Sequence, residues 1–172
     1  ASYALIGGFL VVQKGMPIGV GLLACIGIGV LIGLFNGVLI AIMDLPPFLA
    51  TLCTCMITRG LGPALCGGFG VSWPSAISSQ GAFRNVFKFI APNGMVVPVG
   101  IISMLVLVAV MSFVLDHTRV GRYTIAIGSN KEATRLAGVN IKFYHVLAYV
   151  ISGFFAGLAG IAYASTYATI YP

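Results

Sequence analysis

The chain has 172 residues, of which 59% are hydrophobic and only 7% are charged. A soluble domain has about half apolar and about a quarter charged residues, so this composition excludes a soluble globular protein and a disordered segment. The four cysteines are scattered through apolar runs, which excludes a secreted disulfide framework. The composition therefore predicts an integral membrane protein. The net charge of the chain is +6.

Uncharged runs divide the chain into candidate membrane spans. About 20 helical residues cross roughly 30 Å of hydrocarbon. Residues 18–43, 95–115 and 143–171 each meet this length. Residues 45–70 form a fourth apolar run, but prolines, glycines and Arg59 interrupt it, so we predict a broken or re-entrant helix there. The expected fold is an all-α, polytopic transmembrane protein.

The first segment does not fit a complete span. Residues 1–12 are apolar but too short to cross a bilayer. Ala1 is neither an initiating Met nor preceded by the basic region of a signal peptide. The start looks truncated, and residues 1–172 are expected to form one partial transmembrane region.

The distribution of cations predicts the orientation. Residues 116–142 carry five Lys and Arg residues against two acids, whereas residues 71–94 carry two cations. Because short loops rich in Lys and Arg face the cytoplasm, we expect residues 116–142 inside and residues 71–94 outside. Residues 95–115 then run inward, and residues 143–171 run outward.

Counting backwards, residues 45–70 run outward and residues 18–43 run inward, which puts Asp44 at the cytoplasmic edge. If residues 45–70 re-enter on the same side instead, everything before them is inverted. In the outer loop, Phe83 and Phe87 lie at helical spacing and predict a short amphipathic helix at the membrane interface, with Trp73 before it. That helix is either an interface anchor or a docking surface for an external partner.

Small residues recur every four positions in two of the predicted spans. Such spacing lets the backbones of two helices approach closely, so these stripes are predicted to be packing surfaces rather than transport chemistry. The glycines are Gly29, Gly33 and Gly37 in the first stripe and Gly153 and Gly157 in the second.

A few polar residues lie inside the apolar runs and are candidates for a translocation path. An unsatisfied amide is costly there, so Asn36 is predicted either to bond across helices or to line a polar path. Arg59 follows Thr51 and Thr54 along the next run. A cation inside a bilayer is a functional candidate, but Arg59 would reach water instead if a break at Gly60 placed it at a helix end.

The sequence offers no metal site and no catalytic group. Cys53 and Cys55 are two positions apart, and neither His117 nor His145 has a paired ligand at zinc-site spacing. No phosphate-binding loop or nucleophile motif is present, and the chain has only three acids. We therefore expect a transport subunit rather than an enzyme, with no metal or other cofactor bound by this chain and with energy supplied by another subunit or an ion gradient.

The predicted cytoplasmic segment contains a short capped helix. The residues from Lys131 onward are helix formers, with Ser129 or Asn130 as the predicted N-cap and Gly138 as the C-terminal stop. Ala133 and Ala137 form a narrow face that can enter a groove on a partner. The alternative is a solvated linker helix.

Two blocks of this sequence resemble the membrane permease subunits of ribose-type sugar ABC importers. The first is GLFNGVLIAIMDLPPFLATLCTCMITRGLGPALCGG, residues 33–68. The second is DHTRVGRYTIAIGSNKEATRLAGVNIKFYHVLAYVISGFFAGLAGI, residues 116–161. Because such permeases are much longer, the resemblance implies that this chain is an incomplete fragment of a larger permease.

The resemblance also implies that residues 116–142 form a cytoplasmic loop with a coupling helix, which docks on a separate ATPase subunit that uses ATP. One departure is Thr134, where the family usually has Ala. The implied partners are the ATPase, an extracytoplasmic sugar-binding protein, a second permease copy and membrane lipid, without nucleic acid, in the cytoplasmic (inner) membrane of a prokaryote. The implied coupling residues are Asn130, Glu132, Ala133, Arg135 and Gly138.

Three other readings compete with the import of a ribose-like monosaccharide. A branched-chain amino acid ABC permease is the rival within the resemblance. A secondary transporter or channel would also have glycine-rich, broken helices, but it is expected to bury acids, and Asp44 and Asp116 lie at run ends. A membrane scaffold would have no substrate path at all.

Overall fold

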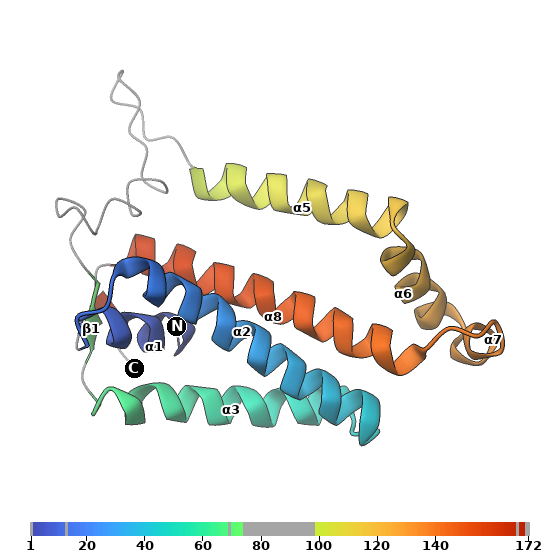
Figure 1. The fold of residues 1–172 in the computed structure, drawn as a ribbon, viewed down its shortest axis with the longest axis horizontal. Coiled ribbons are helices and arrows are strands. Elements are labelled where there is room, and N and C mark those ends of the chain that lie inside the picture. The colour runs from blue at the N-terminus through green and yellow to red at the C-terminus, as the bar shows by residue number, and fades with distance from the viewer. Residues whose placement is uncertain (1, 13, 69, 74–98, 168, 171–172) are drawn as a thin grey trace.

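A computed structural model describes residues 2–12, 14–68, 70–73, 99–167 and 169–170 (Figure 1). The predicted amphipathic helix at Phe83 and Phe87 lies outside the described residues. The helices are α1 (Ser2–Val12), α2 (Ile18–Ile42), α3 (Pro47–Leu65), α5 (Val99–His117), α6 (Arg119–Ser129), α7 (Lys131–Leu136) and α8 (Ile141–Thr166). Two short strands, β1 (Val71–Ser72) and β2 (Thr169–Ile170), pair antiparallel.

Four of these helices, α2, α3, α5 and α8, are long and apolar enough to cross a membrane. The predicted spans and the helical fold class are confirmed. The two-residue ribbon of β1 and β2 was not predicted, because it joins residues almost 100 positions apart and gives no local hydropathy signal.

The prediction of a broken helix in residues 45–70 is wrong. Helix α3 continues through Arg59, Gly60 and Gly62 and contains Pro63 in its last turn. A proline removes one backbone hydrogen bond and crowds the preceding turn, but here the helix ends two residues later, so little is left to disrupt. Pro47 begins α3 at a position where no intrahelical N–H partner is needed.

The spanning helices alternate in direction (Figure 1). The turn from α2 to α3 lies at the same end of the bundle as α6 and α7, and this end is called the α7 end below. Both termini and β1 lie at the opposite end. Asp44 occupies the α2–α3 turn with φ of 50°, a left-handed conformation that follows a helix C-terminus and that Asp tolerates. The alternation therefore matches the order that the charge analysis predicts.

Helices α2 and α8 make the most extensive contact between described elements. A Cβ added at Gly33 would lie 3.1 Å from the Gly153 Cα, and one at Gly37 would lie 2.9 Å from the Val146 Cα. A Cβ at Gly157 would lie 2.7 Å from the Ile26 Cα. The backbones thus touch without intervening side chains, and all five glycines of the two predicted stripes lie in this contact.

A small core closes the end opposite α7. Helix α1 packs against α2, α3, α8 and β1. Trp73 is buried, and its Nε1 donates to the Ala4 carbonyl oxygen at 3.2 Å. Trp73, which begins the predicted outer loop, therefore packs inside the protein, with its ring beside Gly8 of α1. The core comprises Ala4, Leu5, Val11, Cys25, Cys66, Val71, Trp73, Ala164 and Ile170.

Because the backbones of α2 and α8 touch, a larger side chain in place of glycine is expected to be tolerated only on the face of α2 that points away from α8. Gly33→Val is expected to lower the free energy of unfolding of the complete permease by about 1–3 kcal/mol, because an overpacked contact forces the backbones apart. Gly27→Val is the matched control, since no atom lies within 4 Å of a Cβ at that position of the same helix. Denaturant titration in detergent measures both variants, and equal destabilisation would contradict the contact.

Candidate functional site

Three short-range caps build the α7 end. Thr118 caps α6 by accepting from the Gly121 N–H at 3.3 Å. Asn130 caps α7 by accepting from the Ala133 N–H at 3.0 Å. Asn140 caps α8 by accepting from the Phe143 N–H at 3.3 Å. Each cap satisfies an N–H that would otherwise be unpaired at a helix start. The chain can therefore begin three helices between Thr118 and Asn140 with these N–H groups hydrogen-bonded.

Helix α6 connects this end to both neighbouring spans. Gly121 lies against the Leu115 backbone at the end of α5, where a side chain would not fit. Tyr123 packs edge-on against Tyr144 of α8, with ring centroids 5.2 Å apart. Ile127 is buried on the same helix. Helix α6 therefore packs against the end of α5 and the start of α8.

Helix α7 has the form that the sequence predicts. Of the two N-cap candidates, Asn130 is the cap and Ser129 ends α6. Gly138 has φ of 81°, a conformation that favours glycine, and follows the helix by two residues. Glu132, Ala133 and Arg135 are all exposed. The coupling candidates therefore lie on one short, capped and accessible helix.

Thr134 is not on the accessible face. As a departure from the family pattern, Thr134 is predicted to affect docking, but it is buried, and its hydroxyl donates to the Asn130 carbonyl oxygen at 2.8 Å. Because a threonine hydroxyl can satisfy itself on its own helix, the extra oxygen is accommodated inside α7. The departure from the family pattern thus leaves the exposed face unchanged.

Leu136 is an accessible apolar residue of α7 that no sequence pattern predicts. It ends α7 with 88% of its surface exposed, the highest value among the large exposed hydrophobic residues of the described chain. A single leucine beside a charged run gives no periodic signal. Its place directly before the Ala137 and Gly138 helix stop could have indicated an apolar contact residue.

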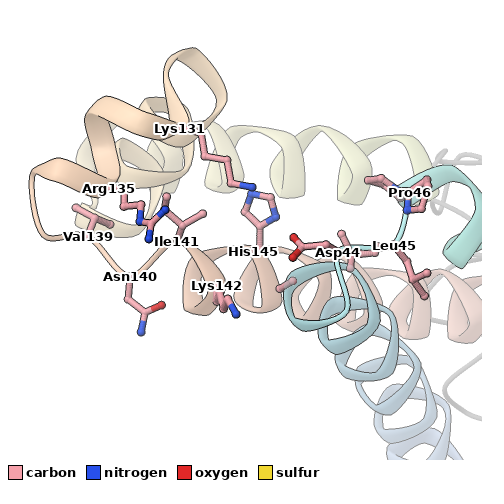
Figure 2. A pocket seen from close by; sticks show the side chains of 13 residues that line it. Asp44, Leu45, Pro46, Lys131, Arg135, Val139, Asn140, Ile141, Lys142 and His145 are labelled. Carbon is pink, nitrogen blue, oxygen red and sulfur yellow. The ribbon is translucent and has the colours of Figure 1, made fainter.

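A cleft of about 640 Å³ lies between α7 and the α2–α3 turn. Figure 2 shows Lys131 pointing from α7 toward His145 of α8, with the Asp44 carboxylate facing the same ring. Arg135 and Lys142 line the cleft as well. Among the described residues, no ion pair joins Asp44 to any of these cations. The α7 end thus holds a basic cleft next to the coupling candidates.

The candidates for a translocation path do not gather into one site. Thr54 and Asn36 are buried against each other, and the Thr54 hydroxyl donates to Asn36 Oδ1 at 2.7 Å. Thr51 donates instead to the Pro47 carbonyl oxygen of its own helix at 2.8 Å. Arg59 is exposed in mid-helix, without the break that would have placed it at a helix end. Asn36 and Thr54 therefore join α2 to α3.

The described residues contain no group of three or more metal-ligating side chains. In the same part of the chain the four cysteines are free thiols, two buried and two exposed.

Apolar spans, a glycine-packed helix pair and a capped helix beyond the span ends define a polytopic membrane protein. The comparison with known families agrees with that class. Residues 2–172 match the family described as "Branched-chain amino acid transport system / permease component", and the chain belongs to this family.

Curated relatives of this chain carry names of sugar permeases. The fructose import permease protein FrcC of Rhizobium meliloti is 33% identical over 165 residues, which is 92% of this chain and 44% of that protein. The ribose import permease protein RbsC of Escherichia coli K12 is 33% identical over 138 residues, or 80% of this chain and 42% of that protein.

A third relative, the galactofuranose transporter permease protein YtfT of Escherichia coli K12, is 31% identical over 156 residues. This match includes 88% of this chain and 42% of that protein. The chain therefore spans less than half the length of the relatives it matches. No solved structure matches it.

The Asn36 to Thr54 bond is expected to stabilise the α2–α3 pair. Polar contacts between membrane helices contribute about 0.6 kcal/mol on average and up to about 1.7, so a double-mutant cycle of Asn36→Leu and Thr54→Val should give a coupling energy in that range. Thr51→Val is the matched control, because that hydroxyl bonds only within α3. Zero coupling in detergent unfolding would show that the two side chains act independently.

Proposed function

We propose that this chain is part of the membrane permease of an ATP-binding cassette importer for a monosaccharide, and that α7 is the helix that docks on the ATPase. The observation that carries the proposal is the geometry of α7. It is a capped, six-residue helix beyond the ends of the spanning helices, with Glu132, Arg135 and Leu136 exposed on it.

The connections of α7 suit a mechanical coupling. On one side α6 joins it to α5, and on the other Val139 and Asn140 join it to α8. Helix α8 in turn packs on α2 through the glycine contact. A movement of α7 would therefore reach two spanning helices through capped and packed elements, as alternating access requires.

The names of the relatives favour a sugar as the substrate. Those proteins are named for fructose, ribose and galactofuranose, although the family is named for branched-chain amino acids. A monosaccharide is thus the substrate class that we propose. The remaining partners would be an extracytoplasmic sugar-binding protein and a second permease copy, assembled in the cytoplasmic membrane of a prokaryote.

The positions of the acids argue against an ion-coupled secondary transporter. Such a transporter is expected to bury acids within its spans to bind ions or protons. All three acids of this chain, Asp44, Asp116 and Glu132, are instead exposed at the α7 end. ATP hydrolysis by a partner is the energy source that this distribution supports.

Substitutions on α7 should separate ATP hydrolysis from sugar uptake. Gly138→Val is expected to abolish most ATP-dependent uptake while the permease still inserts, because valine is strained at φ of 81°. Gly138→Asn is the conservative control and should keep most of the uptake, because asparagine tolerates this conformation. Glu132→Lys should uncouple in the same way by reversing a charge on the docking face.

The measurement is sugar uptake and ATPase activity of the assembled importer in proteoliposomes. Wild-type uptake in Gly138→Val or in Glu132→Lys would remove α7 from the coupling mechanism. Loss of uptake in Gly138→Asn to the same degree as in the valine variant would show that the conformation at this residue is not the cause.

The orientation of α7 is tested by labelling. Leu136→Cys in a cysteine-free background places a thiol at the most accessible apolar position of α7. A membrane-impermeant maleimide should label it in inverted membranes and not in intact cells. Labelling from the outer side alone would overturn both the orientation and the docking of an ATPase.

A further inference from the structure

We infer that the basic cleft at the α7 end binds an anionic phospholipid, with the lipid phosphate between α7 and the start of α8. This inference rests on the proposed function, in which α7 faces the cytoplasm and the cleft therefore lies at the inner leaflet. Three properties of the cleft carry it, namely its unneutralised charge, its depth in the membrane and the apolar cavity that adjoins it.

The charge of the cleft is positive and incompletely paired. Lys131, Arg135 and Lys142 line it together with one carboxylate, Asp44. Three cations and one anion leave a net charge of +2 from the Lys, Arg and Asp side chains, and no ion pair of Asp44 occurs within the described part of the chain. Arg and Lys bind phosphate oxygens through charge-assisted hydrogen bonds. An anion with more than one acceptor oxygen is therefore the expected ligand.

The position of the cleft along the spans indicates which anion it would meet. The 26 residues of α8 and the 25 of α2 extend over about 39 and 37 Å, against roughly 30 Å of hydrocarbon and 40–45 Å with the headgroups. The first turns of α8 and the last turn of α2 thus lie at headgroup level. Lys142, His145 and Asp44 belong to these turns or directly follow them.

An apolar cavity adjoins the charged cleft. It has a volume of about 420 Å³ and lies between α2, α3, α6 and α8. Ile40, Pro47, Lys131 and His145 line both spaces, so the two are contiguous. The second space is as open as the first, is largely apolar and is lined by Ile127, Tyr144, Ala148 and Tyr149.

A charged space beside a largely apolar one fits an amphiphile. A free phosphate or an acidic peptide of a partner would occupy the charged part alone. A phospholipid would place its phosphate near Lys131 and Arg135 and its first acyl methylenes beside Ile40 and Ala148. Basic pockets between spanning helices on the cytoplasmic side are a recognised form of lipid-headgroup site.

Such a lipid would connect α7 to the bundle. Helix α7 itself makes only sparse contacts with α8, and the cleft separates it from the α2–α3 turn. A phosphate bound from both sides would fill that separation. The coupling helix would then be held by the membrane as well as by its caps.

Native mass spectrometry of the complete permease, purified and delipidated in detergent, tests this inference. Phosphatidylglycerol should bind more tightly than phosphatidylcholine. Lys131→Ala with Arg135→Ala should weaken phosphatidylglycerol binding about thirtyfold, since each basic residue contributes about 1 kcal/mol toward an anionic headgroup. The matched control is Arg119→Ala with Arg122→Ala, two exposed cations of α6 that line neither space.

A second variant probes the apolar space. Ala148→Trp should fill it and weaken the binding of long-chain phosphatidylglycerol while leaving both charged residues in place. Equal losses in the two double variants would mean that surface charge alone attracts the lipid, and the inference would be overturned. Displacement of the lipid by an equal concentration of inorganic phosphate would overturn it as well, by showing a simple anion site.

Lipid binding is measured without the ATPase. Uncoupling by the α7 variants and lipid binding therefore succeed or fail separately, so that a wrong function and a wrong lipid site are distinguishable.

Discussion

The close approach of α2 and α8 is the contact on which the rest of the structure depends. Because Gly29, Gly33 and Gly37 face the backbone of α8, the two helices meet directly, and interhelical packing in lipid rests mainly on such van der Waals contact. This contact fixes the start of α8 relative to the end of α2. It thereby sets Asp44 opposite His145 and determines where α7 stands relative to the bundle (Figure 2).

Polar groups inside the spans are satisfied locally, which limits what they can do for a substrate. Asn36 and Thr54 engage each other, and Thr51 bonds its own helix. A sugar carries many hydroxyl groups and needs partners that are free to bond. Within the described residues, the hydroxyl hydrogens of Thr51 and Thr54 therefore act first as links between and within helices.

Features encoded by neighbouring residues could be predicted from the sequence, and features encoded by distant contacts could not. Hydropathy predicted three of the four spans and the apolar run of the fourth, and small-residue spacing predicted the glycines of α2 and α8. Residue chemistry gave Asn130 as one of two caps and Gly138 as the stop. The unbroken α3, the burial of Trp73 by α1 and the burial of Thr134 depend on packing that no local pattern contains. The cleft likewise arises from segments almost 90 positions apart, Asp44 and Lys131.

The two ends of the bundle differ in a way that bears on transport. At the end opposite α7, α1, Trp73 and the β-ribbon form a continuous apolar core, so motion there would expose buried surface. The α7 end is built from capped short helices around an open, charged cleft instead, and it has few buried side chains to separate. Local opening costs least where apolar burial is smallest. A force applied at α7 would therefore reach α2 through α8 and the glycine contact, whereas it would pass directly to the α2–α3 turn only across a filled or bridged cleft.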